Sequence, residues 1–206
     1  RVAAAPGEIP VVAIGPLPNI AAALALDDRF AGAVKEIVVM GGYFLGQMNR
    51  QRMPGEFNWW IDPDAAAVVL RSGAPLRLVG LDVTLRVRVT RDDAARMSSG
   101  AGDFGRFAGA CVTAWLDRMA DARPSDPEAG RWSGLHDPLA VAVVSRADLV
   151  TFTPAHVEVI RDDPGRGIAV ADLLASAHAP VPNALIATDV DVDGFRSYLL
   201  DRIGAL

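Results

Sequence analysis

Short apolar runs alternate with helix-like segments along most of this chain. The runs PVVAIG (10–15) and EIVVMGG (36–42) are rich in β-branched residues and end at glycine, which predicts buried strands. The segment at 17–26 predicts a helix, and the segment at 62–73 predicts another, bracketed by an Asp-Pro start and a glycine stop. A further strand is expected within 74–84. This order predicts an α/β fold with a Rossmann-like, mainly parallel sheet and helices on both faces.

In such a sheet, ligands bind beyond the carboxyl ends of the strands. The stretch GLHDPLAVAVV places His136 and Asp137 together at the head of an apolar helix-like run. Asp137 before a proline is a good helix cap, and capping alone would account for it. Capping does not account for His136, whose pKa is easily moved across neutrality by burial or a neighbouring carboxylate. The pair is therefore a candidate for chemistry as well as for a helix start.

The polar loop after the second strand contains GEFNWW. Glu56 and Asn58 lie two residues apart, so in an extended stretch both would point the same way, as neighbouring sugar hydroxyls would require. The alternative is an ordinary loop in which Asn58 caps a turn. Trp59 and Trp60 are expected either to form an aromatic lid over a flat ring or simply to be buried.

Composition narrows the class of protein. The 206 residues are 51% hydrophobic, and residues 1–206 are expected to form one domain. No apolar run reaches the ~20 residues of a membrane span, so we expect a soluble, cytoplasmic protein that does not bind membranes. The net charge of −5 argues against a nucleic-acid partner, and the arginines that alternate with apolar residues in 77–91 indicate a strand with a solvated face. The single cysteine, Cys111, is expected to be a buried thiol without a catalytic role.

One short motif imitates a metal site. TDVDVDG places Asp189, Asp191, Asp193 and Gly194 in the register of a calcium loop, but its twelfth position is Leu200 instead of glutamate. Alternation with valines favours a strand whose carboxylates cap the next helix.

Five motifs in order give the chain a resemblance over about residues 11–195. VAIGPLPNIAAAL, EIVVMGG, GEFNWWIDPDAAAVVL, PLRLVGLDVT and LHDPLAVAVV are similar, in sequence and spacing, to segments of the inosine-uridine-preferring nucleoside N-ribohydrolases. This resemblance implies calcium-dependent hydrolysis of the N-glycosidic bond of ribonucleosides to ribose and free base, in a homo-oligomer (dimer or tetramer).

The same resemblance assigns roles to individual residues. It makes the Asp137 carboxylate and the Ile14 carbonyl calcium ligands. It makes His136 the group that protonates the departing base. The sugar contacts it implies are Glu56, Asn58, Met40 and Asn49, the last with one extra residue in the intervening spacing.

The chain also departs from the family. The aspartate-rich motif D-x-D-x-x-x-D-D, which supplies most metal carboxylates and the general base, does not occur, and the early pair Asp27-Asp28 follows a helix and is expected to be solvated. We therefore expect residues 1–206 to be the C-terminal portion of a nucleoside hydrolase. Two alternatives remain: a non-catalytic homologue acting as a binding or scaffold subunit, and an enzyme for a different nucleoside-like substrate.

Overall fold

The computed structural model describes residues 1–100, 102–174 and 178–204. Its main sheet has six strands within these residues, in the order β1-β2-β3-β8-β6-β7. The first four in this order are parallel, whereas β6 pairs antiparallel with both β8 and β7. The mainly parallel sheet predicted from the sequence is thus confirmed. The strands are β1 (Pro10–Ala13), β2 (Glu36–Met40), β3 (Leu76–Val79), β6 (Val150–Val159), β7 (Ala169–Asp172) and β8 (Ala184–Val190).

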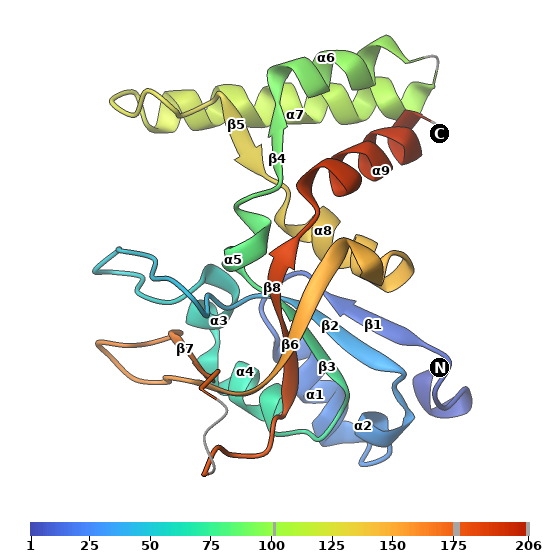
Figure 1. Ribbon diagram of the computed structural model, residues 1–206, viewed down its shortest axis with the longest axis vertical. Coiled ribbons are helices and arrows are strands. Elements are labelled where there is room, and N and C mark those ends of the chain that lie inside the picture. Colours follow the sequence, from blue (N-terminus) through green and yellow to red (C-terminus); the bar gives the residue numbers. More distant parts are fainter. Residues whose placement is uncertain (101, 175–177, 205–206) are drawn as a thin grey trace.

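Helices cover both faces of this sheet (Figure 1). Strand β2 is buried throughout, and its side chains alternate between two hydrophobic clusters: Ile37 and Val39 join one, Val38 and Met40 the other. One cluster includes residues of α4 and the other residues of α8 and α9. The helices are α1 (Pro18–Leu26), α2 (Phe30–Ala33), α3 (Phe57–Ile61), α4 (Pro63–Leu70), α5 (Leu81–Thr84), α6 (Arg91–Ser99), α7 (Asp103–Ala122), α8 (His136–Ser145) and α9 (Val192–Gly204), with 3-10 helices at Val2–Ala4 and Ala147–Leu149. In the part of the chain that is described, no helix is both long and apolar enough to span a membrane.

The predicted start and end of α4 are also confirmed. The Asp62 carboxylate accepts a hydrogen bond from the Ala65 N–H at 2.9 Å, and Gly73 turns the chain with φ +74°. In contrast, residues 77–91 do not form one strand. The chain leaves β3 at Gly80, turns through the short helix α5 and forms the strand β4 (Arg88–Thr90) of a separate ribbon.

That ribbon leads to an arm above the sheet (Figure 1). Strand β4 pairs antiparallel with β5 (Trp132–Gly134), and between them the chain forms α6 and α7. The two helices can approach closely because Gly105 has no side chain. A Cβ at this position would lie only 2.7 Å from the Met97 carbonyl oxygen. Buried Asp93 of α6 forms an ion pair with Arg196 of α9, which fastens the arm to the body. Cys111 is exposed on α7, so the expectation of a buried thiol was wrong.

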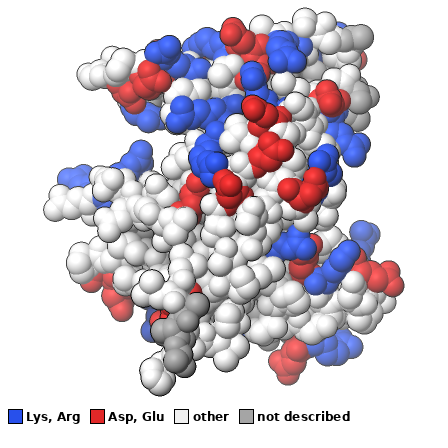
Figure 2. All heavy atoms as spheres, viewed as in Figure 1, with Lys and Arg blue, Asp and Glu red and all other residues white. Residues whose placement is uncertain are grey.

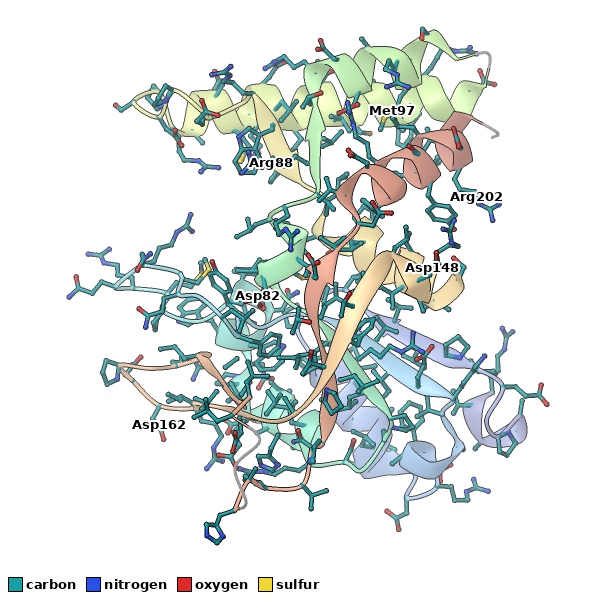
Figure 3. The ribbon with its side chains drawn as sticks, in the orientation of Figure 1. Asp82, Arg88, Met97, Asp148, Asp162 and Arg202 are labelled. Carbon is teal, nitrogen blue, oxygen red and sulfur yellow. The ribbon has the colours of Figure 1, made fainter. Side chains whose placement is uncertain are left out.

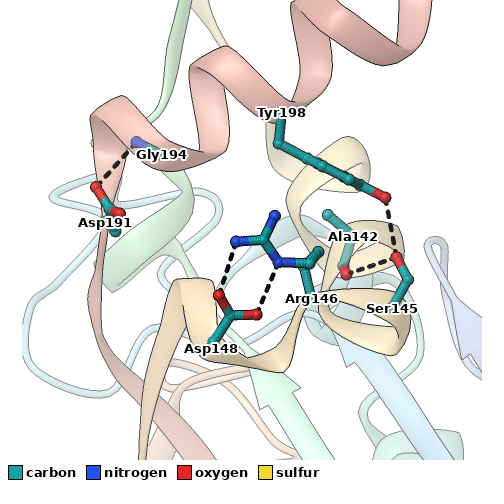
Figure 4. Close-up of polar contacts among 7 residues, drawn as sticks. All are labelled: Ala142, Ser145, Arg146, Asp148, Asp191, Gly194 and Tyr198. Carbon is teal, nitrogen blue, oxygen red and sulfur yellow. Dashed lines mark hydrogen bonds and ion pairs between the residues drawn. The ribbon is translucent and has the colours of Figure 1, made fainter.

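The segment TDVDVDG, which has the spacing of a calcium loop, forms the end of strand β8 and the capped start of α9. Strand β8 ends at Val190, and the Asp191 carboxylate accepts a hydrogen bond from the Gly194 N–H at 2.9 Å (Figure 4). Arg146 pairs with Asp148 nearby, and the Tyr198 hydroxyl hydrogen-bonds Ser145. The capping interpretation of this motif is therefore confirmed.

Candidate functional site

A cleft of about 710 Å³ opens beyond the carboxyl ends of β1, β2 and β3, between the sheet and the arm. Figure 2 shows the molecule hollowed between the end of α7 and the loop that follows β2. The cleft lining includes all but one of the seven site residues named from the sequence: Ile14, Met40, Glu56, Asn58, His136 and Asp137. The fold thus gathers into one cavity residues that are up to 123 positions apart, since Ile14 and Asp137 both line it.

The loop after β2 is held in place by Asp82 of α5. Its carboxylate accepts hydrogen bonds from the Phe44 N–H at 2.9 Å and the Leu45 N–H at 2.7 Å. Figure 3 shows Asp82 beside this loop. Because α5 follows β3, this anchor ties the entrance of the loop to the neighbouring strand.

Glu56 is the N-cap of α3 and is only 4% exposed. One carboxylate oxygen accepts from the Asn58 N–H at 3.0 Å, and the other accepts from the Gly42 and Trp59 N–H groups, both at 3.3 Å. Burial raises the pKa of Glu56, the three backbone donors lower it, and the nearby charge of Asp137 raises it further. A carboxylate offers about four acceptor positions. With three occupied, one is left for a hydroxyl in the cleft.

Asn58 lies in the first turn of α3, so Glu56 and Asn58 are brought together by a helix start and not by the extended stretch expected from the sequence. The Asn58 side-chain amide donates to the Met40 carbonyl at 3.1 Å and to the Met40 sulfur at 3.3 Å. These contacts use both amide hydrogens, while the side-chain carbonyl has no protein donor within the described residues. Together with Glu56, this wall presents hydrogen-bond acceptors.

His136 is the first residue of α8, and its orientation is fixed by α5. Its Nδ1 lies 2.8 Å from the hydroxyl oxygen of Thr84, which is fully buried. A Cβ at Gly134 would lie 2.7 Å from Nε2, so only glycine leaves that edge of the ring free. Burial lowers the pKa of His136, and Asp137 opposes this shift. Sequence reasoning missed Thr84, because 52 residues separate it from His136.

Asp137 lies inside the first turn of α8. The N-cap is Leu135, and in the described chain no side-chain hydrogen bond caps this helix, so capping does not account for Asp137. Burial raises the pKa of Asp137 and the neighbouring His136 lowers it. Three titratable groups with shifted pKa values, at Glu56, His136 and Asp137, therefore share one cleft, as is common in functional sites.

The cleft offers a divalent cation only part of a binding site. Asp137 offers a carboxylate, and Ile14, directly after β1, lines the same cavity and offers a backbone carbonyl. Calcium takes six to eight oxygen ligands. Residues 1–100, 102–174 and 178–204 contain no group of three or more histidine, cysteine, aspartate or glutamate side chains placed to hold a metal. These residues alone do not fit a complete calcium site.

The opposite wall of the cleft comes from the arm and was not predicted. Trp115 and Met119 of α7 line it, together with Arg123 directly after that helix and Trp132 of β5. The Trp115 indole N–H donates to the Ser133 hydroxyl at 2.9 Å. The Arg88 guanidinium lies 3.8 Å from the centre of the Trp132 ring, on the underside of the arm (Figure 3). This wall is aromatic and half-exposed.

The two tryptophans after Asn58 do not form a lid. Trp59 is fully buried against Phe44 in the core, with ring centres 5.9 Å apart, and its indole N–H has no partner among the described residues. The backbone of Trp60 lies against Gly167. Asn49, in the loop with φ +52°, is not among the residues that line the cleft, and its assignment to the sugar stays a prediction.

Comparison with known proteins places the chain in one family. The family model described as "Inosine-uridine preferring nucleoside hydrolase" matches residues 1–197. Uridine nucleosidase 1 of Arabidopsis thaliana is 31% identical over 96% of this chain and 59% of its own length. A putative pyrimidine-specific ribonucleoside hydrolase, RihB, of Shigella boydii is 32% identical over 93% of this chain and 76% of its own length.

Solved structures give the same picture. A purine-preferring ribonucleoside hydrolase from Gardnerella vaginalis superposes with a TM-score of 0.86 at 33% identity, covering 99% of this chain and 63% of that one. The plant nucleoside hydrolase PpNRh1 superposes with a TM-score of 0.87 at 29% identity, covering 100% and 64%. The chain spans about 60% of the length of the first curated relatives it matches.

Proposed function

Because this chain belongs to the inosine-uridine preferring nucleoside hydrolase family, we propose that the protein hydrolyses the N-glycosidic bond of ribonucleosides to ribose and free base. The observation that carries this proposal is the cleft itself. Buried acceptors at Glu56 and Asn58 face the same cavity as His136, whose Nε2 edge is left open by Gly134. Relatives with this family's name act on nucleosides, and the cleft has the groups that such a substrate needs.

The two ends of the cleft suit the two halves of a nucleoside. Ribose hydroxyls donate to the free acceptor position of Glu56 and to the side-chain carbonyl of Asn58, with Met40 beside the sugar. The base lies toward the arm, against Trp132 and Trp115. In this pose His136 lies between sugar and base, at the bond to be cleaved.

In the reaction, water adds to the anomeric carbon while the carbon–nitrogen bond breaks and its electron pair leaves with the base. The proton that the water loses passes to solvent, and His136 later regains its own proton from solvent. His136 donates a proton from Nε2 to a nitrogen of the departing base, which lowers the barrier to cleavage. Its hydrogen bond to Thr84 keeps the ring in place for this transfer. Within the described residues, we assign no general base to the attacking water.

We propose calcium as the ion that the protein requires. Support comes from the family resemblance and from the oxygen donors that Asp137 and Ile14 offer, since both residues line the cleft. When bound, calcium would orient oxygen ligands of the substrate and water. A homo-oligomeric, cytoplasmic protein is also part of this proposal.

The deciding experiment measures ribose released from inosine, uridine, cytidine and adenosine, with a calcium chelator and after calcium is restored. Release that is lost with chelator and recovered with calcium is the expected result. Release that persists in chelator would contradict the calcium requirement. No release from the protein as the cell makes it, folded and supplied with calcium, would contradict hydrolysis. Calorimetric titration with the same nucleosides would then test the alternative of a non-catalytic binding subunit.

A further inference from the structure

The loop between β6 and β7, residues 160–168, lies against the helix that carries Asn58. The loop is closed by its own backbone: the Gly167 N–H donates to the Ile160 carbonyl at 2.7 Å, and the Ile160 N–H donates to the Ile168 carbonyl at 2.9 Å. It reaches α3 from a distant part of the sequence, since 106 residues separate Arg166 from Trp60. The loop therefore contacts α3 through an end that has its own backbone hydrogen bonds.

Arg166 makes the polar part of this contact. Its Nε donates to the Trp60 carbonyl at 2.9 Å and its Nη2 donates to the Ile61 carbonyl at 3.1 Å. Helix α3 ends at Ile61, and α4 begins at Pro63, which has no N–H, so these carbonyls take their donors from outside the helix. The planar guanidinium fits two adjacent carbonyls, and Nη1 also donates to the Arg161 carbonyl at 3.5 Å within its own loop.

Two glycines make the contact close. Gly167 has φ +78°, and a Cβ there would lie 2.5 Å from the Trp60 Cα. A Cβ at Gly55, directly before Glu56, would overlap the backbone of Gly167. The loop therefore touches both sides of the segment, before its N-cap and at its C-terminal end.

We propose that Arg166, supported by Gly167, is a positioning residue that holds α3 so that Glu56 and Asn58 meet the ribose. The inference deepens the proposed function and rests on it for the identity of the ligand. Arg166 itself does not line the cleft. Without it, the Trp60 and Ile61 carbonyls lose their donors, the single turn of α3 opens, and the N–H groups that fix the Glu56 carboxylate move with it.

The test combines hydrogen exchange of the protein with steady-state kinetics on inosine. For Arg166→Ala we expect the amides of residues 57–61 to exchange at least ~10-fold faster, and KM for inosine to rise ~10-fold with a smaller change in kcat. Arg166→Lys, which keeps one donor group, should recover part of both effects. The matched control is Arg161→Ala on the same loop. Among the described residues the Arg161 side chain forms only an exposed pair with Asp64 at 3.4 Å, so this change should leave both readouts unchanged.

The outcomes separate this inference from the proposed function. If exchange at residues 57–61 and KM are unchanged in Arg166→Ala, or change equally in Arg161→Ala, the positioning role is wrong. If Arg166→Ala does not fold, Arg166→Lys and Arg166→Gln carry the same comparison. If the wild-type protein releases no ribose, the proposed hydrolysis is wrong. Faster exchange at α3 in Arg166→Ala but not in Arg161→Ala would still support the positioning role of Arg166, and unchanged exchange would overturn it.

Discussion

The two walls of the cleft differ in how firmly they are built. On the sheet side, Glu56 and Asn58 are 4% and 7% exposed. Glu56 accepts hydrogen bonds from the first turn of α3 and from the Gly42 N–H, and Asn58 donates to the carbonyl and the sulfur of Met40. On the arm side, Trp115 is 47% exposed and Trp132 is held by Arg88 and Glu128 at the surface. The first wall is buried and fixed, and the second is open.

This contrast matches the two halves of the proposed substrate. Ribose is the same in every ribonucleoside, so buried acceptors in fixed positions serve all of them. Bases differ in size and polarity, and aromatic faces accept them with little dependence on hydrogen-bond pattern. We infer that the sheet wall binds the ribose of every substrate and that the arm wall determines the preference among bases. His136 lies between them and is expected to matter most.

The largest effect is expected for His136→Ala. Loss of a positioned proton donor costs roughly 10²–10⁴ in rate, so kcat for inosine should fall by that factor. A riboside with a nitrophenolate leaving group needs no proton, and its hydrolysis should be reduced far less. Ribose release and nitrophenolate absorbance measure the two rates.

The controls for this prediction are Thr84→Ser and Thr84→Val. Serine keeps the hydroxyl that lies 2.8 Å from His136 Nδ1 and should retain activity, whereas valine removes it at nearly constant volume and should lower kcat for inosine. Equal losses for inosine and for the nitrophenyl riboside in His136→Ala would contradict the proton-donor role.

The next largest effect is expected at the sugar. Removing a hydrogen bond to a charged group costs about 1.5–3 kcal/mol, so Glu56→Gln should lower kcat/KM for inosine by roughly 10- to 100-fold. A deoxynucleoside that lacks the contacted hydroxyl should show little further loss in this variant. The matched control is Glu158→Gln, an exposed carboxylate that does not line the cleft, where no such loss is expected.

The two walls differ in how much of each could be predicted from the sequence. Strands that end at glycine, the Asp62-Pro63 helix start and the clustering at the carboxyl ends of strands all follow from local patterns, and the structure confirms them. Helix α3 does not follow from such a pattern, because its five residues are too few to show a repeating helical periodicity. Its N-cap is Glu56, whose carboxylate accepts from the N–H groups two and three residues further on.

The arm wall could not be read from the sequence for a different reason. Helix α7 is amphipathic, but the pattern does not tell which partner its Trp115 side faces, because that depends on how the β4–β5 ribbon rises from the sheet. The Thr84–His136 contact likewise joins distant segments. Trp59 and Trp60 show the converse error, since aromatic residues beside a motif suggested a lid, and tertiary packing buried one and placed the other against Gly167.

A smaller effect is expected on the arm. Trp132→Ala removes an aromatic contact worth about 0.5–1.5 kcal/mol, so the ratio of kcat/KM for inosine to that for uridine should change by roughly 2- to 10-fold. Phe107→Ala serves as the control, because Phe107 is 65% exposed on the same arm but does not line the cleft. An unchanged ratio in Trp132→Ala, or a change as large in Phe107→Ala, would contradict the assignment of base preference to this wall.

The smallest effect is a pH dependence carried by Glu56. Burial, the largest cause, raises its pKa above the usual value of 4.5, so the carboxylate gains a proton before an exposed glutamate would as the pH falls. Protonation removes an acceptor for ribose, and KM for inosine should rise on the acid side. The same shift affects stability with the opposite sign. Because the folded protein holds this proton more tightly than the unfolded chain, the contribution of Glu56 to folding is present at low pH and is lost as the pH rises through the raised pKa.

Glu56→Gln, which does not ionise, isolates both parts of this pH effect. Its KM should lack the acid-side rise seen in the wild type, and its thermal midpoint relative to the wild type should increase as the pH is raised from about 4 to 7. Differential scanning fluorimetry and inosine kinetics across this range measure the two trends. A wild-type KM that stays flat across this pH range would mean that the sheet wall does not bind ribose through an ionised Glu56. The two walls would then differ in burial alone.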